Sequence, residues 1–253
     1  MERCYRRLPL TGLLNARDLG GYPTSDGRIT KFHTLIRSEA PLKLTDGDLA
    51  FLKEYGIKTS IDFRGDREVD RQPSAMKDEK WLRYLRSPTF NEQVAFGSRK
   101  KGQGPPVTAF VDWGEKYVEM AEGCKDWARC TLETISESAG GVLYNCTTGK
   151  DRTGMISALL LGLCGVSKDD ITADYCVSEV YLTPVYKELI RAFSELWPEE
   201  VVNITDPFFK TNPKNMACLL GHFEKGYGGV TAYVKSCGVR DEVIEALKLK
   251  LVF

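Results

Sequence analysis

The sequence is poor in the residues and segments that mark metal-binding, secreted and membrane proteins. Only two of its 253 residues are histidines, and no two of its eight cysteines are spaced as C-x-x-C. Since zinc sites are built from such ligands, we expect no metal and no cofactor. The N-terminus lacks the apolar segment of a secretion signal, and no run of about eighteen apolar residues occurs. We therefore expect a cytoplasmic protein without disulfides or an integral membrane segment.

An excess of either charge is also missing. The 35 Lys and Arg residues balance the 35 Asp and Glu residues, whereas nucleic-acid-binding domains carry a basic excess. Nucleic acid is therefore not the expected partner, although a local basic pocket is compatible with this balance. No repeat of fixed period and no linker rich in Gly, Ser or Pro divides the chain, so we predict one domain over residues 1–253.

The pattern of apolar residues predicts an α/β fold. Residues 29–36 and 57–63 are rich in β-branched and aromatic side chains, as strands are. Between them, Thr45 is a good N-cap for a helix that Gly56 would end. This strand-helix-strand order favours an α/β sheet. The other predicted elements are a strand at 142–146 and helices at 112–137, 155–165, 169–182, 183–197, 213–227 and 240–251.

One short stretch carries most of the functional information. Residues 144–154 read YNCTTGKDRTG and lie between a predicted strand and a predicted helix. Such a glycine-bearing loop points backbone N–H groups at one anion, and the helix dipole adds positive potential. Gly149 and Gly154 would allow close backbone approach, and the planar fork of Arg152 suits two phosphate oxygens. The residues expected to hold a phosphate are Thr147, Thr148, Gly149, Lys150, Asp151 and Arg152.

Cys146 stands at the start of this loop. The same positive field favours its thiolate form, and a thiolate that faces a bound phosphate is a nucleophile aimed at phosphorus. The hydroxyl of Thr153 could donate to the sulfur when the sulfur departs. These residues predict phosphoryl transfer in two steps, through a phosphocysteine and without a metal.

Two other protein classes use similar residues. A P-loop NTPase requires G-x-x-x-x-G-K-[ST], but Asp151 follows Lys150, and Tyr144 stands where the first glycine belongs. A cysteine sulfurtransferase also has a cysteine in an anion loop, but its chemistry requires no arginine six residues further on. The purely structural interpretation is a buried cysteine near a surface arginine. Against it, none of the other seven cysteines is followed by an arginine at that distance.

The stretch resembles the signature loop of a known family. NCTTGKDRTG is similar to the C-x5-R-[ST] loop of the cysteine-dependent protein tyrosine phosphatases. Its G-K-D-R-T-G form is that of the bacterial tyrosine and lipid phosphatases related to the secreted mycobacterial enzyme. Further segments resemble that family in the same order, at residues 15–22, 37–39, 56–69, 173–179 and 227–234.

The resemblance implies a central, mostly parallel sheet flanked by helices, with a helical C-terminal part. It implies phosphatase activity on phosphotyrosine, extending in this family to phosphoserine, phosphothreonine or phosphoinositides. Cys146 would be the nucleophile, Arg152 the phosphate clamp, and Lys150 a contact to a second phosphate of a phosphoinositide. The expected partners are thus phosphorylated proteins or phosphoinositides, and phosphate, sulfate or vanadate could occupy the loop.

One position departs from the family pattern. The family usually has histidine directly before the cysteine, whereas this sequence has Asn145. An amide can hydrogen-bond to the backbone but cannot carry charge. We expect a working but slower enzyme, and the alternative is a catalytically weakened module that binds phosphate.

The leaving alcohol also needs a general acid. The Trp-Pro-Asp tripeptide of classical tyrosine phosphatases is missing, since Trp197-Pro198 is followed by Glu199. Asp151 is the first candidate because it lies in the phosphate loop. The alternative is that its charge only stabilises the N-terminus of the following helix.

Asp62 and Arg64 are supporting candidates, because ligands of α/β sheets lie beyond the carboxyl ends of strands. Glu92, in a long loop expected at 87–106, is a further candidate acid. His33 and His222 are remote from the motif and are expected to be ordinary histidines. An equally good interpretation of the other charged residues is a structural network of Arg17, Asp18, Arg37, Glu39, Asp62 and Arg64.

Overall fold

The computed structural model describes residues 4–89, 112–196 and 210–253. Its centre is a five-stranded sheet in the order β1-β2-β5-β3-β4. Only the pair β1–β2 is antiparallel, and the other three pairs are parallel. The strands are β1 (Arg17–Asp18), β2 (Leu35–Ser38), β3 (Ile57–Asp62), β4 (Arg83–Arg86) and β5 (Gly141–Asn145).

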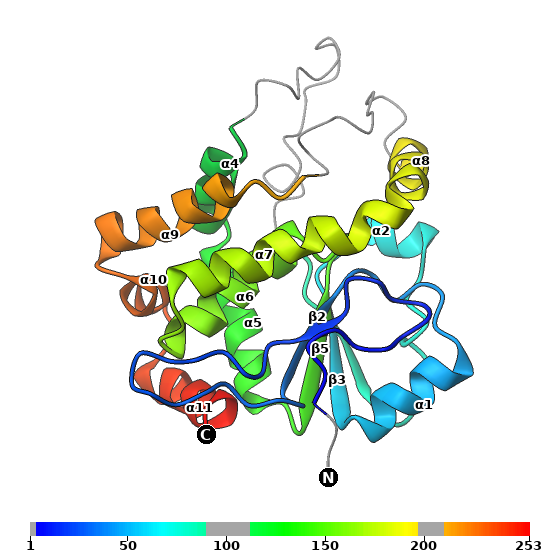
Figure 1. Ribbon diagram of the computed structural model, residues 1–253, viewed down its shortest axis with the longest axis horizontal. Coiled ribbons are helices and arrows are strands. Elements are labelled where there is room, and N and C mark those ends of the chain that lie inside the picture. Colours follow the sequence, from blue (N-terminus) through cyan, green and yellow to red (C-terminus); the bar gives the residue numbers. More distant parts are fainter. Residues whose placement is uncertain (1–3, 90–111, 197–209) are drawn as a thin grey trace.

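Helices cover both faces of the sheet and its carboxyl end (Figure 1), so the expected α/β fold with a mostly parallel sheet is confirmed. The α-helices are α1 (Asp46–Glu54), α2 (Asp66–Arg71), α4 (Trp113–Gly123), α5 (Lys125–Glu137), α6 (Asp151–Leu163), α7 (Lys168–Leu182), α8 (Tyr186–Leu196), α9 (Pro213–Tyr227), α10 (Val230–Ser236) and α11 (Asp241–Leu251). A short 3-10 helix, η2 (Thr183–Val185), joins α7 to α8.

Several predicted boundaries are correct. Thr45 is the N-cap of α1, where its side chain accepts a hydrogen bond from the amide of Asp48. Gly56 follows the end of that helix with a φ of 92°, a conformation that favours glycine. The C-terminal part is helical as expected, and α9 has the predicted bounds.

Other boundaries are wrong. The strand expected at 29–36 begins only at Leu35, because Ile29 and Thr30 form isolated bridges to Pro23 and Val252 instead. The helix expected at 112–137 is two helices, α4 and α5, since the backbone of Cys124 leaves the helical conformation. The helix expected at 155–165 begins at Asp151, inside the motif.

The central strand β5 divides the interior into two cores. Val142 and Tyr144 lie in the larger core, which is formed with α4, α5, α6 and the C-terminal helices, whereas Leu143 lies in the smaller core beside α1. Side chains of a strand alternate between its faces. Cys146, two residues beyond Tyr144, accordingly belongs to the larger core, at the point where β5 ends.

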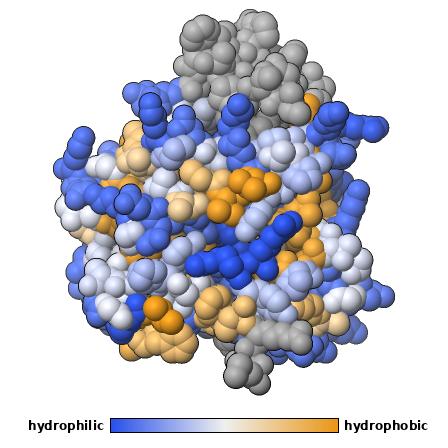
Figure 2. All heavy atoms as spheres, viewed as in Figure 1, coloured by the Kyte–Doolittle hydropathy of each residue, from blue (hydrophilic) through white to orange (hydrophobic). Residues whose placement is uncertain are grey.

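In the part of the chain that the structure describes, few large hydrophobic side chains are exposed. Within the described residues, the exposed large hydrophobic side chains are Ile29, Val180, Leu249 and Phe253. Hydrophilic side chains cover much of the face in Figure 2, and hydrophobic ones gather near its middle. No helix in the described ranges has the length and hydrophobicity needed to cross a membrane.

Candidate active site

The motif occupies the carboxyl end of the central strand. β5 ends at Asn145, the loop runs from Cys146 to Lys150, and α6 begins at Asp151. Because β5 lies between β2 and β3, the loop is surrounded by the ends of neighbouring parallel strands. This is where ligands bind in open α/β sheets. Cys146 is buried there, with 2% of its surface exposed.

Four successive carbonyl groups of the loop accept hydrogen bonds, three of them from the surrounding structure and the fourth from the first turn of α6. The oxygen of Thr147 accepts from the amide of Ala40 at 3.1 Å, and that of Thr148 from Asn15 Nδ2 at 3.0 Å. The oxygen of Gly149 accepts from Arg37 Nη2 at 2.7 Å, and that of Lys150 from the amide of Gly154 at 2.9 Å.

These bonds orient the loop amides. In a trans peptide the C=O and the following N–H point in opposite directions, and no peptide bond in the described residues is cis. Holding the carbonyls of residues 147–150 by these bonds therefore turns the amides of residues 148–151 the other way. Amides arranged in this manner at a helix N-terminus form an anion site.

Gly149 is required by this backbone path. Its φ is 70°, and a Cβ atom added to it would lie 2.3 Å from the carbonyl oxygen of Ser38. Gly154 is different, since a Cβ there would make an ordinary 3.4 Å contact with the ring of Tyr175. The expectation of close backbone approach therefore holds at Gly149 and not at Gly154.

Behind the loop, one buried carboxylate binds two arginines. Asp174 of α7 accepts from Arg17 Nε at 2.8 Å and from Arg37 Nη1 at 2.5 Å. Burial alone would raise the pKa of Asp174, but the charges of the two arginines hold it below its usual range. Arg17 Nη1 also donates to Asn15 Oδ1 at 2.6 Å, so the amide that binds Thr148 is itself oriented. The loop carbonyls are thus held by a buried network.

The predicted structural network is present only in part. Arg17 and Arg37 share Asp174, which the sequence analysis did not include. Asp18 instead accepts from Tyr55 and two amides, and Glu39 accepts from the amides of residues 14 and 15. The predicted single network is therefore not formed, because Asp18, Glu39 and Asp62 each bind different partners.

Arg152 is held by a second carboxylate. Its Nη1 lies 2.9 Å from Glu68 Oε2, and its Nη2 lies 3.0 Å from Glu68 Oε1. The same nitrogens donate to the carbonyl of Phe63 and to the hydroxyl of Thr147, both at 3.1 Å. Burial alone would raise the pKa of Glu68, but the charge and hydrogen bonds of Arg152 lower it to about 2. The guanidinium is therefore fixed in place beside the loop.

Asp151 is bound from behind by α4. The hydroxyl of Tyr117 donates to Asp151 Oδ1 and lies 2.7 Å from the hydroxyl of Tyr175. Lys150 Nζ lies 3.6 Å from the same carboxylate oxygen and 5.9 Å from the ring centre of Trp113. The N-terminus of α6 thus brings together the carboxylate of Asp151, the amine of Lys150 and the hydroxyls of Tyr117 and Tyr175.

Asn145 and the supporting candidates form one buried group. Asn145 Nδ2 donates to Asp62 Oδ1 at 3.2 Å, across the neighbouring strands. Arg64 Nη2 donates to Asp62 Oδ2 at 2.7 Å, and the hydroxyl of Tyr84 to the same oxygen at 2.9 Å. Asp62 is fully buried and bound by three side chains, which supports a positioning role for it and for Arg64.

Within the described residues, the side chains of the remaining candidates make no hydrogen bond to the loop. Thr153 is fully buried, and its hydroxyl has no partner within the described part of the chain. His33 contacts the carbonyl of Tyr55, and His222 of α9 contacts Glu122 of α4. Glu92 lies outside the described residues.

Glu68, Tyr117, Asp174 and Tyr175 are among the site residues that were not predicted. Glu68 and Asp174 lie in the segments 56–69 and 173–179, whose family resemblance could have indicated them. Tyr117 gave no signal, because its position in a helix made it resemble an ordinary core residue.

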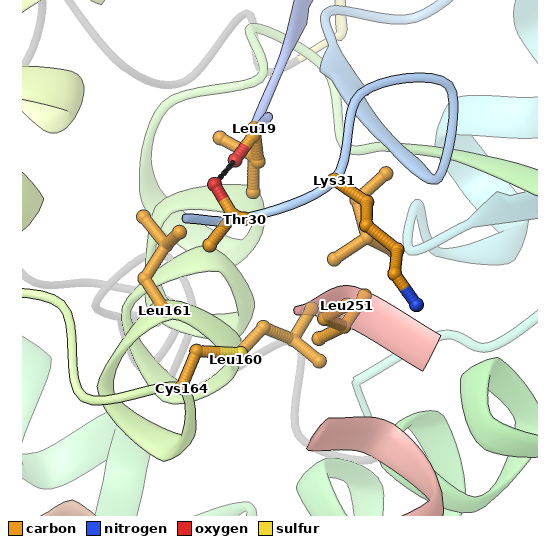
Figure 3. Close-up of a pocket in the computed structure, with 8 residues that line it drawn as sticks. Leu19, Thr30, Lys31, Leu160, Leu161, Cys164 and Leu251 are labelled. Carbon is orange, nitrogen blue, oxygen red and sulfur yellow. Dashed lines mark hydrogen bonds between the residues drawn. The ribbon is translucent and has the colours of Figure 1, made fainter. Parts of the chain in front are cut away.

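A small cavity lies at the other end of α6. It measures about 10 Å³ and is lined mainly by leucines, including Leu160 and Leu251 (Figure 3). The hydroxyl of Thr30 already donates to the carbonyl of Leu19 at 2.7 Å. At about 1.5 Å of rise per residue, more than roughly 10 Å of helix separates this cavity from Arg152. It is an apolar packing gap, apart from the loop.

A mostly parallel sheet whose central strand passes through a cysteine loop into an arginine-bearing helix is the arrangement that the resemblance to the cysteine-dependent phosphatases implies. Comparison with known proteins gives the same class. The sequence model of the tyrosine phosphatase family matches residues 8–253. The chain therefore belongs to the tyrosine phosphatase family and is a hydrolase of the protein-tyrosine phosphatase type.

Two relatives cover most of the chain. A tyrosine-protein phosphatase of Nostoc commune is 29% identical over 219 residues, which span 83% of this chain and 71% of the relative. The triple specificity protein phosphatase PtpB of Mycobacterium tuberculosis is 26% identical over 281 aligned positions, which span 96% of this chain and 97% of PtpB. The predicted membership of this phosphatase family is thereby confirmed.

Proposed function

We propose that this protein hydrolyses phosphotyrosine through a phosphocysteine intermediate. The observation that carries the proposal is the backbone of the loop. Its carbonyls at residues 147–149 are bound by the surrounding structure and that of Lys150 by α6, so its amides are left to face an anion above Cys146. Cys146 lies at the base of that loop, and Arg152 lies at its side, fixed by Glu68.

The chemistry proceeds in two displacements. The thiolate of Cys146 forms a bond to phosphorus while the bond from phosphorus to the leaving oxygen breaks, and Asp151 gives its proton to that oxygen. Water then attacks phosphorus and returns a proton to Asp151, and the bond to sulfur breaks. The loop amides and Arg152 bind the phosphoryl oxygens in both steps. The sum is hydrolysis of the ester to an alcohol and phosphate.

The substrate range extends to other phosphate esters. Lys150 supports activity on phosphoinositides, because its amine lies at the loop beside Asp151 and could contact a second phosphate. The name of the mycobacterial relative, a triple specificity protein phosphatase, supports activity beyond a single class of phosphoester. Phosphate, sulfate and vanadate are the expected inhibitors, since each matches the anion that the loop is arranged to bind.

A variant of the nucleophile tests the proposal. Hydrolysis of p-nitrophenyl phosphate is measured for the unmodified protein, for Cys146→Ser and for Cys164→Ser, each with and without a chelator. We expect turnover that survives chelation and is inhibited by vanadate, that is lost in Cys146→Ser, and that persists in Cys164→Ser. Cys164 is a suitable control because it is also buried but lies at the far end of α6.

Two results would contradict the proposal. Appreciable turnover by Cys146→Ser would remove Cys146 as the nucleophile. If the unmodified protein binds phosphate, measured by calorimetry, but does not hydrolyse p-nitrophenyl phosphate, the alternative of a phosphate-binding module replaces the enzyme.

A further inference from the structure

Asp151 is the first residue of a chain of side chains that crosses four helices. Its Oδ1 accepts from the hydroxyl of Tyr117, on α4. That hydroxyl lies 2.7 Å from the hydroxyl of Tyr175, on α7. Tyr175 is hydrogen-bonded in turn to the side chain of Asn215, on α9. Residues of α6, α4, α7 and α9 are therefore joined through one line of polar atoms.

We infer that Tyr117 and Tyr175 are positioning residues that hold Asp151 for proton transfer in both of its protonation states. This inference rests on the proposed function, in which Asp151 is the general acid. It goes further, because it assigns a role to two phenols that do not touch the reacting atoms.

The physical basis is the number of hydrogen bonds that a phenolic hydroxyl can make. It donates one and can accept another, so Tyr117 donates to Asp151 Oδ1 while it accepts from Tyr175. The amide of Asn215 can donate to Tyr175 in the same direction. The proton that the leaving oxygen needs then lies on the other carboxyl oxygen, Oδ2, because a proton on Oδ1 would point at Tyr117. Oδ1 can therefore accept from Tyr117 whether or not Oδ2 carries that proton.

Burial makes this arrangement consequential. Tyr117 is 4% exposed and Tyr175 is fully buried, so bulk water cannot replace either hydroxyl. Their rings also meet edge to face, with centres 5.8 Å apart, which restricts rotation of both side chains. Burial, followed by the charge of Asp151, raises the pKa of both tyrosines. Both phenols therefore keep their protons as the carboxyl changes its charge.

The test compares leaving groups. Turnover of phenyl phosphate, whose leaving oxygen needs a proton, is divided by turnover of p-nitrophenyl phosphate, whose leaving group needs little help. The ratio is measured for the unmodified protein, Tyr117→Phe, Tyr175→Phe and Asp151→Asn. Tyr233→Phe is the matched control. The hydroxyl of Tyr233 is also buried and donates to the carbonyl of Ala121 on α4, the helix that carries Tyr117, at 2.7 Å. It is not part of the hydrogen-bonded line that begins at Asp151.

We expect Tyr117→Phe to lower the ratio by about tenfold, with little change in KM. This fall should be smaller than the fall in Asp151→Asn. Tyr175→Phe should lower it in the same direction by less, since Tyr117 can still donate to Asp151. Tyr233→Phe should leave it unchanged.

Several results would overturn the inference. If Asp151→Asn lowers the ratio while Tyr117→Phe and Tyr175→Phe leave it unchanged, the positioning role is wrong and the proposed general acid stands. If Tyr117→Phe does not fold, Tyr175→Phe decides alone. If Asp151→Asn itself leaves the ratio unchanged, both the acid and the chain behind it are refuted. An equal fall of both substrates in Tyr117→Phe and Tyr233→Phe would show that the phenol only supports α4.

Discussion

Both carboxylate oxygens of Glu68 bind the guanidinium of Arg152, one to each terminal nitrogen, at 2.9 and 3.0 Å. Such a two-point pair fixes the plane of an arginine as well as its position. Glu68 lies on α2, which follows β3, whereas Arg152 lies on α6, which follows β5. The pair therefore links the phosphate loop to α2, the helix that follows the neighbouring strand β3. It also holds Arg152 in position before any substrate binds.

We predict that Glu68→Gln weakens both catalysis and folding. Arg152 would lose the charge that orients it, so kcat/KM for p-nitrophenyl phosphate should fall by about tenfold or more. The free energy of unfolding at neutral pH should fall by about 2–3 kcal/mol, as expected for a buried carboxyl whose pKa is lowered to about 2. Urea unfolding and steady-state kinetics measure the two effects.

The pH dependence of this stabilisation has a definite sign. Glu68 is more acidic when folded than in the unfolded chain, where its pKa is about 4.3. Its contribution is therefore complete above about pH 4.3 and is lost as the pH falls toward 2. The difference in stability between the unmodified protein and Glu68→Gln should shrink over that range. Asp66→Asn, on the same helix but 82% exposed, is the control and should change stability by less than about 0.5 kcal/mol. A difference independent of pH would contradict the ion pair.

We predict that Gly149→Ala abolishes phosphate binding, whereas Gly154→Ala does not. Alanine at 149 would place a methyl group 2.3 Å from the carbonyl oxygen of Ser38 in a backbone of positive φ, so the loop must change its path. At 154, inside α6, alanine meets only ordinary contacts and should be neutral or stabilising by up to about 1 kcal/mol. Calorimetry with vanadate and thermal unfolding check both variants. Normal vanadate binding by Gly149→Ala would show that the loop does not bind the anion through its backbone.

We predict that Lys150→Ala separates the two substrate classes. Loss of one charge-assisted contact to a second phosphate, worth roughly 1.5–3 kcal/mol, should slow phosphoinositide hydrolysis by about tenfold or more. Turnover of p-nitrophenyl phosphate, which has no second phosphate, should change little. Lys116→Ala is the control, because Lys116 is a partly exposed lysine of α4 that pairs with Glu119. If Lys150→Ala slows both substrates equally, the lysine maintains the shape of the loop and the proposed lipid activity loses its support.

We predict that Asn145→His makes Cys146 more reactive. The side chain at 145 faces the carboxylate of Asp62, which would favour a protonated imidazole and so add positive charge next to the loop. Inactivation by iodoacetamide near pH 6 should become faster than in the unmodified protein. Asn145→Gln, which enlarges the side chain without charge, should not accelerate it. Equal rates in both variants would show that the loop amides and Arg152 alone set the reactivity of the thiol.

The sequence by itself determined the local parts of this protein. The order of strands and helices followed from periodicity and from residues such as Thr45 and Gly56, because caps and turns depend on a few neighbours. The spacing from Cys146 to Arg152 indicated an anion loop for the same reason, since six consecutive residues define its backbone. Where nearby residues do not determine the backbone conformation, the predictions were wrong. Examples are the break between α4 and α5 at Cys124 and the start of β2 at Leu35.

Only the tertiary structure decided which distant residues serve that loop. Glu68 binds Arg152 across 84 positions of the chain, and Arg37 binds the carbonyl of Gly149 across 112. Tyr117 looked like a core residue, and its hydroxyl became a partner of Asp151 only because α4 packs beside α6. A parallel sheet gathers the carboxyl ends of remote strands at one edge, and a single sequence carries no record of which side chains will meet there.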